Sequence, residues 1–213
     1  MQLPAGTKIA GWKTVNDWNN HKTLLADFAN TTAWTTAYTE YFLTRLQDRY
    51  LGPLNTIKDN GTYRGEGFSI MAIICSLVEF LESTYQGINY RYKTKADPPL
   101  GQFEYGGSAD IFISFLTRRS PFDKNFNQTT AENFYKYVRC GLLHEARTKG
   151  NWTIWGATST DILIENKTTE VIVYRDNFLK ATNTFIEEYK TDLLNSNDRK
   201  EAFIRKYDNL CSE

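Results

Sequence analysis

The stretch YKYVRCGLLHEAR, residues 135–147, carries the strongest functional pattern of this chain and has the spacing of an amphipathic helix. Within it, Arg139 and His144 are separated by four residues, and the chain contains only two histidines. An imidazole moves protons near neutral pH, and a guanidinium is a permanent, forked donor to phosphate oxygens. The pattern therefore suggests cleavage of a phosphodiester without a metal, and RNA is the specific substrate we expect.

Two segments resemble the HEPN superfamily, whose members are small helical nucleotide-binding proteins and, in many cases, ribonucleases. The run from Phe134 to Arg147 is similar to the signature helix of that superfamily. The segment Arg64–Phe68, followed directly by the apolar run SIMAIICSLVEFLEST, resembles the preceding helix of the same fold. The resemblance covers roughly residues 62–148. The chain departs from the pattern at Cys140, because catalytic members usually carry Asn, Asp or His directly after the arginine.

The resemblance implies both an assembly and a reaction. HEPN ribonucleases are dimers whose signature helices meet across a two-fold axis, so we expect a homodimer through residues 131–147 with Arg139 and His144 from both copies in one cleft. Positions five apart on an α-helix point about 140° apart, so one copy alone does not bring the two side chains together. The implied reaction cleaves RNA to a 2′,3′-cyclic phosphate and a 5′-hydroxyl. The implied role is that of a toxin, an antiviral (antiphage) factor or a stress-response protein, with an antitoxin or another regulatory protein as a further partner.

Other residues are candidates to support this site. Glu79 is the preferred carboxylate to orient Arg139, ahead of Glu82, because it lies near the inner stripe of its predicted helix. Cys140 is expected to be a core or interface thiol, and Tyr137 is expected to pack more than to bind. The basic residues that could contact an RNA backbone are Arg147, Lys149, Arg118 and Arg119.

The same residues also have structural explanations. His144 near a helix end can interact with the helix dipole, and Arg139 can form an ion pair with a glutamate of the adjacent helix. Gly141 permits close approach, either at a dimer crossing or against a neighbouring helix of the same chain. The tract Arg91–Lys95 places a tyrosine among basic residues, which suits a nucleic acid but is equally typical of a solvated loop.

Two other classes of function stay open. One is a non-catalytic HEPN-like module that binds a nucleotide or a protein and keeps the signature helix for dimerisation, which Cys140 slightly favours. The second is an unrelated helical interaction domain in which Arg139 and His144 coincide by chance. Burial of His144 inside one subunit would favour the module over the nuclease, and absence of a two-fold contact through residues 131–147 would favour the interaction domain.

Composition bounds the class of protein. At 213 residues the chain fits a single domain, residues 1–213, with a HEPN-like core at about 32–148 and a hairpin and C-terminal helices at 160–211. Lys and Arg number 25, as do Asp and Glu, so the net charge is zero. That balance argues against a protein that coats nucleic acid by bulk electrostatics, but it permits a local grip in a cleft.

Cysteine usage and hydropathy indicate the compartment. Cys75, Cys140 and Cys211 lie far apart without a CxxC pair, so we expect neither a zinc site nor any other cofactor. The N-terminus lacks the basic-then-apolar pattern of a signal peptide. The apolar run Ile70–Leu81 is too short to span a bilayer, so we expect a cytoplasmic protein that does not bind membranes.

The order of the predicted elements is mainly helical. The tryptophans of residues 1–30, Trp12 and Trp18, are expected to dock on the main body. Asp161–Glu165 and Glu170–Tyr174 are β-rich runs that predict a hairpin. The fold class is thus mainly all-α, a HEPN-like bundle of five to six helices with one small β-hairpin insertion near 161–174. The helices are expected at 32–50, ending at Leu51-Gly52-Pro53, and at 67–85, 108–116, 129–147, 177–194 and 199–210, with a long loop at 88–107.

Overall fold

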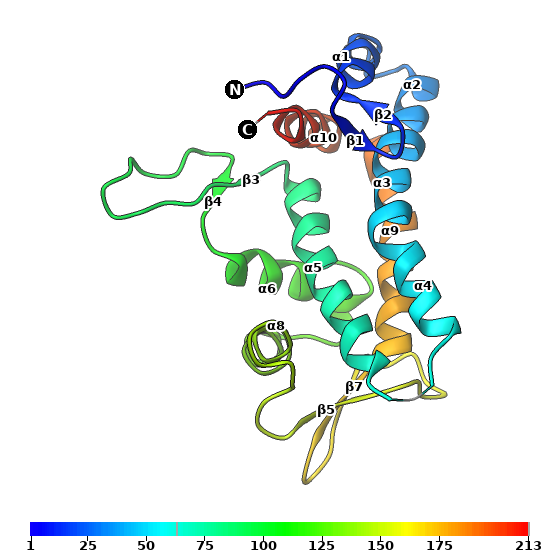
Figure 1. Ribbon diagram of the computed structural model, residues 1–213, viewed down its shortest axis with the longest axis vertical. Coiled ribbons are helices and arrows are strands. Elements are labelled where there is room, and N and C mark those ends of the chain that lie inside the picture. Colours follow the sequence, from blue (N-terminus) through cyan, green and yellow to red (C-terminus); the bar gives the residue numbers. More distant parts are fainter. Residues whose placement is uncertain (63, 213) are drawn as a thin grey trace. The chain divides into compact units, whose positions relative to one another are not determined.

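The computed structural model describes residues 1–62 and 64–212 and is mainly helical, as the sequence predicts (Figure 1). Its internal contacts divide the chain into two compact units. Unit 1 comprises residues 1–53, 83–107 and 188–213, and unit 2 comprises residues 54–82 and 108–187. Three helices contribute residues to both units: α4 (Gly52–Asp59), α5 (Glu66–Gln86) and α9 (Arg175–Asn195).

Unit 1 begins with a small antiparallel hairpin, β1 (Lys8–Ala10) and β2 (Lys13–Thr14). The helix α1 (Val15–Leu24) follows at once, because Thr14 and Asp17 form a reciprocal capping box at its start. This helix adds one to the five or six that the sequence predicts. Trp18 is fully buried, as expected, but Trp12 is 84% exposed at the hairpin tip, so the prediction that both tryptophans dock was wrong.

The next helical run continues through Gly52 and Pro53, where the sequence predicts an end. In an α-helix the prolyl ring would clash with the carbonyl four residues back. Here the π-helical segment η2 ends one residue before Gly52-Pro53 begins the next helix, and the Gly52 N–H bonds to the carbonyl of Gln47, five residues back. A side chain at position 52 would lie 2.8 Å from that carbonyl oxygen, so glycine fits the wide turn. The run comprises α2 (Thr31–Thr36), η1 (Ala37–Leu43), α3 (Thr44–Leu46), η2 (Gln47–Leu51) and α4 (Gly52–Asp59).

The core of unit 1 is aromatic. The helix α10 (Asn197–Leu210), which Ser196 caps, places Phe203 and Tyr207 in a stacked pair with ring centroids 4.4 Å apart. Trp18 packs on Tyr207 at 5.1 Å and donates its indole N–H to Asp208 at 2.9 Å. Two short parallel strands, β3 (Asn89–Tyr90) and β4 (Glu104–Tyr105), frame the predicted long loop.

Unit 2 is built around helices with a second aromatic core. Phe134 stacks on Phe112 at 5.9 Å and on Phe178 at 5.3 Å, with interplanar angles of 18° and 12°. These rings tie the helix that carries the signature residues to α6 and α9. The helical elements of this core, besides the unit 2 parts of α5 and α9, are α6 (Ser108–Arg118), η3 (Phe122–Lys124), α7 (Gln128–Phe134), η4 (Tyr135–Arg139) and α8 (Cys140–Glu145).

The predicted hairpin is confirmed and belongs to a larger sheet. Strands β6 (Ile164–Asn166) and β7 (Val171–Tyr174) pair antiparallel, and β5 (Trp152–Trp155) pairs with β7 in parallel, giving the order β5-β7-β6. The sequence did not predict β5, because its partner strand lies far along the chain. The next helix, α9, begins at Arg175, two residues before its predicted start at 177, and Asp176 lies in its first turn.

Helix α5 bears on the membrane prediction. At 21 residues it extends beyond the apolar run Ile70–Leu81 at both ends, and by length and composition alone it is long and apolar enough to cross a bilayer. About half of its apolar window, 56%, is buried inside the protein. A core helix of a soluble protein presents the same features.

Candidate functional site

The signature residues lie on one continuous helical run, α7–η4–α8. Asn127 begins it, because its side-chain oxygen accepts a hydrogen bond from the Thr130 N–H at 2.9 Å. The middle of the run is the π-helical segment η4, which ends at Arg139, so the helix is widest just before the candidate site. The run ends at Ala146, whose left-handed backbone has a φ of 52°.

Arg139 is held on the inner side of this helix. Its guanidinium lies 5.3 Å from the Tyr135 ring centroid and 3.7 Å from a carboxylate oxygen of Glu79 on α5. The side chains of Arg139 and Glu79 are 16% and 24% exposed, so the pair is largely but not fully buried. The Nε of Arg139 is buried and has no hydrogen-bond partner among the described residues. Glu79, the carboxylate preferred from the sequence, is thus the one that meets Arg139.

Tyr135 is a site residue that the sequence analysis missed. Its hydroxyl shares a 2.7 Å hydrogen bond with Ser108 at the start of α6, which fixes the ring beneath the Arg139 guanidinium. The two residues are four apart on one helix, and this spacing places side chains on the same face. That spacing was a usable signal.

Unlike Arg139, His144 is exposed. It lies in the last turn of α8. Arg139 turns toward α5, so within one chain the two side chains do not meet, as their five-residue spacing predicts. The neighbouring Leu143 is 43% exposed.

Gly141 is packed against its own chain. After Ala146 the backbone turns back, so that the Arg147 N–H bonds to the Gly141 carbonyl and the Lys149 N–H to the Tyr137 carbonyl. A side chain at position 141 would come within 2.4 Å of the Arg147 carbonyl oxygen. The close approach that glycine permits here is therefore intramolecular.

The two supporting residues of the signature helix are half-buried. Tyr137 carries the Lys136 ammonium 5.1 Å from its ring centroid. Cys140 is a free thiol, as is Cys75 on α5. Burial raises the pKa of the Cys75 thiol to about 12, although the positive charge of Arg139 opposes that rise. Cys75 is therefore a protonated core residue at neutral pH.

The four basic residues proposed to contact RNA differ in availability. Arg119 binds the fully buried Glu82 through two hydrogen bonds of 2.7 and 2.9 Å, so it is committed to the core of unit 2. Arg147 and Lys149 both pair with Glu145, at 3.1 and 2.5 Å.

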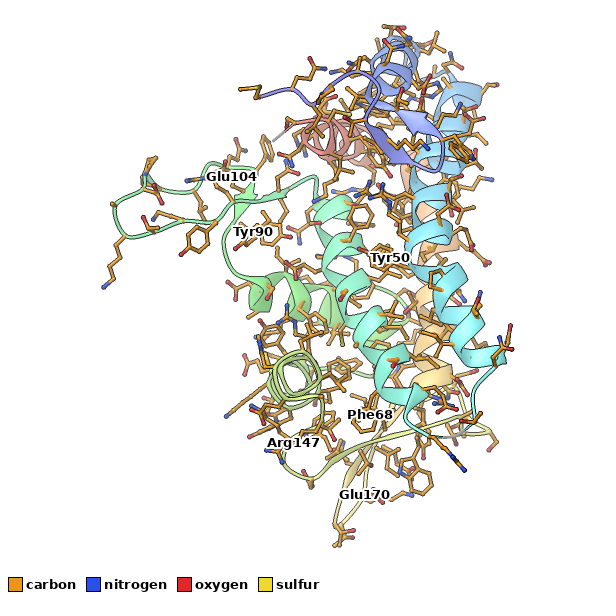
Figure 2. The ribbon with its side chains drawn as sticks, in the orientation of Figure 1. Tyr50, Phe68, Tyr90, Glu104, Arg147 and Glu170 are labelled. Carbon is orange, nitrogen blue, oxygen red and sulfur yellow. The ribbon has the colours of Figure 1, made fainter. Side chains whose placement is uncertain are left out.

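The two cations that pair with Glu145 differ in exposure: the Arg147 side chain is 69% exposed and the Lys149 side chain 34%. Hydrogen bonds from Lys149 and then Arg147 lower the pKa of the Glu145 carboxyl. Arg147 nevertheless stays 69% exposed beside the end of α8 (Figure 2). Arg118 is exposed at the end of α6.

The described residues contain no group of three or more His, Cys, Asp or Glu side chains that could hold a metal ion. Comparison of the chain with protein-family models, with curated proteins and with solved structures gives no match. The resemblance to the HEPN superfamily therefore rests on the two sequence segments around α5 and the α7–η4–α8 run.

Proposed function

We propose that this chain is a metal-independent endoribonuclease of the HEPN type that acts as a homodimer, with a role in defence, toxicity or stress. The observation that carries the proposal is that Arg139 and His144, on one helical run, have different surroundings. Arg139 is oriented by Glu79 and Tyr135, while His144 is exposed in the last helical turn. A fixed guanidinium and a free imidazole are the two groups that metal-free RNA cleavage requires.

The chemistry needs more than one copy of the chain. The RNA 2′-oxygen attacks phosphorus and loses its proton, the bond to the 5′-oxygen breaks, and that oxygen gains a proton. One His144 takes the first proton as a base, and His144 of the partner subunit supplies the second as an acid. Arg139 donates to the phosphoryl oxygens, whose negative charge grows in the transition state.

A second candidate is a non-catalytic HEPN-like module that binds a nucleotide or a protein. Three observations favour it: Arg139 is only 16% exposed, Cys140 follows it, and the Gly141 face is occupied by the chain's own segment 147–149. In this alternative the Arg139–Glu79 pair stabilises the packing of α5 on the signature helix, and His144 has no chemical role.

The experiment is cleavage of labelled total RNA by the purified protein in EDTA. The wild type is compared with His144→Ala and with Glu132→Ala, a matched control because Glu132 is exposed on the same helical run. The proposal predicts that only His144→Ala loses cleavage, and that the products carry 2′,3′-cyclic phosphates. Equal cleavage by all three proteins would exclude His144. No cleavage by a folded dimeric wild type would favour the second candidate.

A further inference from the structure

The loop between β3 and β4 is an ordered arm, here defined as residues 89–105 (Figure 1). The two strands at its base are joined by bonds from the Asn89 N–H to the Phe103 carbonyl, 2.8 Å, and from the Arg91 N–H to the Tyr105 carbonyl, 2.9 Å. Figure 2 shows Tyr90 and Glu104 at this base, from which the rest of the loop extends. Loops of this length are uncommon in compact proteins and are often functional.

One side chain holds the arm together. The Arg91 Nε donates to Glu104 at 2.6 Å, and its Nη2 donates to the carbonyls of Pro98 and Pro99 at 3.2 and 2.7 Å. Glu104 also accepts from the Gly101 N–H at 2.7 Å. The two halves of the arm are therefore fixed to each other before any partner arrives, which lowers the entropy lost on binding.

The base of the arm is also fixed to α10 within unit 1. Lys206 donates to the Ile88 carbonyl at 3.2 Å, and Arg205 donates to the Gly87 carbonyl at 3.3 Å. The Arg205 guanidinium lies 4.1 Å from the centroid of the Phe103 ring. The arm is thus anchored at both of its ends.

The negative charges of the arm are used within it, whereas two of its positive charges face solvent. Its two carboxylates are used internally: Glu104 by Arg91 and Gly101, and Asp97 by the N–H and hydroxyl of Thr94 at 2.6 and 2.8 Å. The lysines, Lys93 and Lys95, are exposed and form no ion pair among the described residues. The free charge that the arm presents is therefore positive.

Aromatic surface accompanies these cations. Tyr92 is 74% exposed and Tyr90 is 53% exposed, although the Tyr90 ring also contacts Tyr105 edge-on at 5.7 Å. Exposed tyrosines beside unpaired lysines match single-stranded nucleic acid, since bases stack on aromatic rings while phosphates attract cations. An acidic protein segment would pair with the lysines, but that pairing would give no role to the two exposed tyrosine rings.

We propose that the arm binds single-stranded RNA, with Tyr92 and Tyr90 stacking on bases and Lys93 and Lys95 contacting phosphates. The inference rests on the proposed function, for which it names a surface that holds the RNA substrate. Because the net charge of the chain is zero, affinity for RNA must come from local surfaces of this kind. Stacking tolerates every base, so this contact carries little sequence preference.

The test measures binding by the full chain carrying His144→Ala, so that the probe stays intact. Fluorescence anisotropy of labelled single-stranded oligouridine is followed at several KCl concentrations. Tyr92→Ala is expected to weaken binding about tenfold. Lys93→Ala and Lys95→Ala are each expected to reduce the salt slope by about 0.7. The matched controls are Trp12→Ala and Lys8→Ala, because Trp12 is 84% exposed outside the arm and Lys8 lies over its ring at 3.7 Å; they are expected to leave binding unchanged.

The outcomes separate this inference from the proposed function. Loss of binding in the arm variants supports the arm even if the wild type cuts no RNA. If the arm variants keep the affinity and the salt slope of the parent protein, the proposal that the arm binds RNA is overturned, even if His144→Ala abolishes cleavage. Arm variants that bind RNA normally but lose binding to a labelled polyglutamate peptide would also overturn it, and would indicate an acidic protein partner instead.

Discussion

Two glutamates on α5, three residues apart, meet arginines in different ways. Glu82 is fully buried and accepts hydrogen bonds from Arg119, at 2.7 and 2.9 Å, and from Ser114, at 2.8 Å. Glu79 is 24% exposed and lies 3.7 Å from Arg139, while the Arg139 Nε has no hydrogen-bond partner in the part of the chain that the structure describes. We refer to Arg119–Glu82 as the closed pair and to Arg139–Glu79 as the open pair.

The difference separates a structural arginine from one that can still bind. The Glu82 carboxylate is fully buried, so removing its arginine leaves a charge without solvent. A partly exposed pair with an unused donor can turn toward an anion at small cost. Both arginines were proposed from the sequence to contact RNA or its phosphates, and only the surroundings of each distinguish them.

The largest expected effect comes from breaking the closed pair. Arg119→Leu leaves the Glu82 carboxylate buried without its partner, so we expect the free energy of unfolding to fall by about 3–5 kcal/mol. Urea unfolding followed by circular dichroism measures it. The double variant Arg119→Leu with Glu82→Leu removes both charges and should recover most of the loss. A loss below about 1 kcal/mol in the single variant would show that the pair is not closed.

Breaking the open pair should affect activity far more than stability. Arg139→Ala is expected to lower the rate of RNA cleavage about 10²–10³-fold. The same change should reduce the free energy of unfolding by about 1–2 kcal/mol, less than the loss for the closed pair, because the remaining Glu79 carboxylate is 24% exposed and keeps some contact with solvent. Arg139→Lys retains the charge beside Glu79 but not the forked donor, so its stability should match wild type while cleavage stays low. Wild-type cleavage by Arg139→Lys would argue that the arginine only balances Glu79.

The helix that carries the open pair can be tested at Gly141. In Gly141→Ala the new methyl group lies 2.4 Å from the Arg147 carbonyl oxygen, so the returning segment must move. We expect a loss of about 1–3 kcal/mol in unfolding free energy. Gly107→Ala is the control, because nothing lies within 4 Å of its added carbon. Equal stability of both variants would contradict the intramolecular packing described here.

The smallest effect concerns the thiols next to the open pair. With a pKa of about 12, roughly one Cys75 in ten thousand is a thiolate at pH 8, and the residue is buried. Iodoacetamide at pH 8 should therefore modify the half-buried Cys140 well before Cys75, as measured by peptide mass spectrometry.

The same reaction reports on assembly. Slower modification of Cys140 as protein concentration rises would support a dimer through residues 131–147. A rate independent of concentration would argue against that interface. Faster modification of Cys75 than of Cys140 would contradict the burial that separates them.

Local pattern predicted most of the helices and the β6–β7 hairpin, because apolar periodicity, caps and turn residues lie within a few positions of one another. It also selected Glu79 as the partner of Arg139. It did not predict β5, whose partner is distant in the chain, or the passage through Pro53, which depends on a widened turn. Nor could it separate Arg119 from Arg139, since the burial of Glu82 results from the packing of α5 against α6 and not from spacing.

The widened turn η4 has a consequence for how this helix can change. Its π-helical bonding accommodates one more residue than an α-helical turn would, immediately before Arg139. Deleting a single residue between Tyr135 and Val138 would let the helix close into regular α-geometry. Because the turn holds one extra residue, this deletion would leave both Phe134 and His144 on roughly their present faces of the helix. The same deletion in a regular α-helical turn would rotate the residues that follow it by about 100°. The π-helical turn is thus a point at which the chain can lose one residue without changing the direction in which the imidazole points.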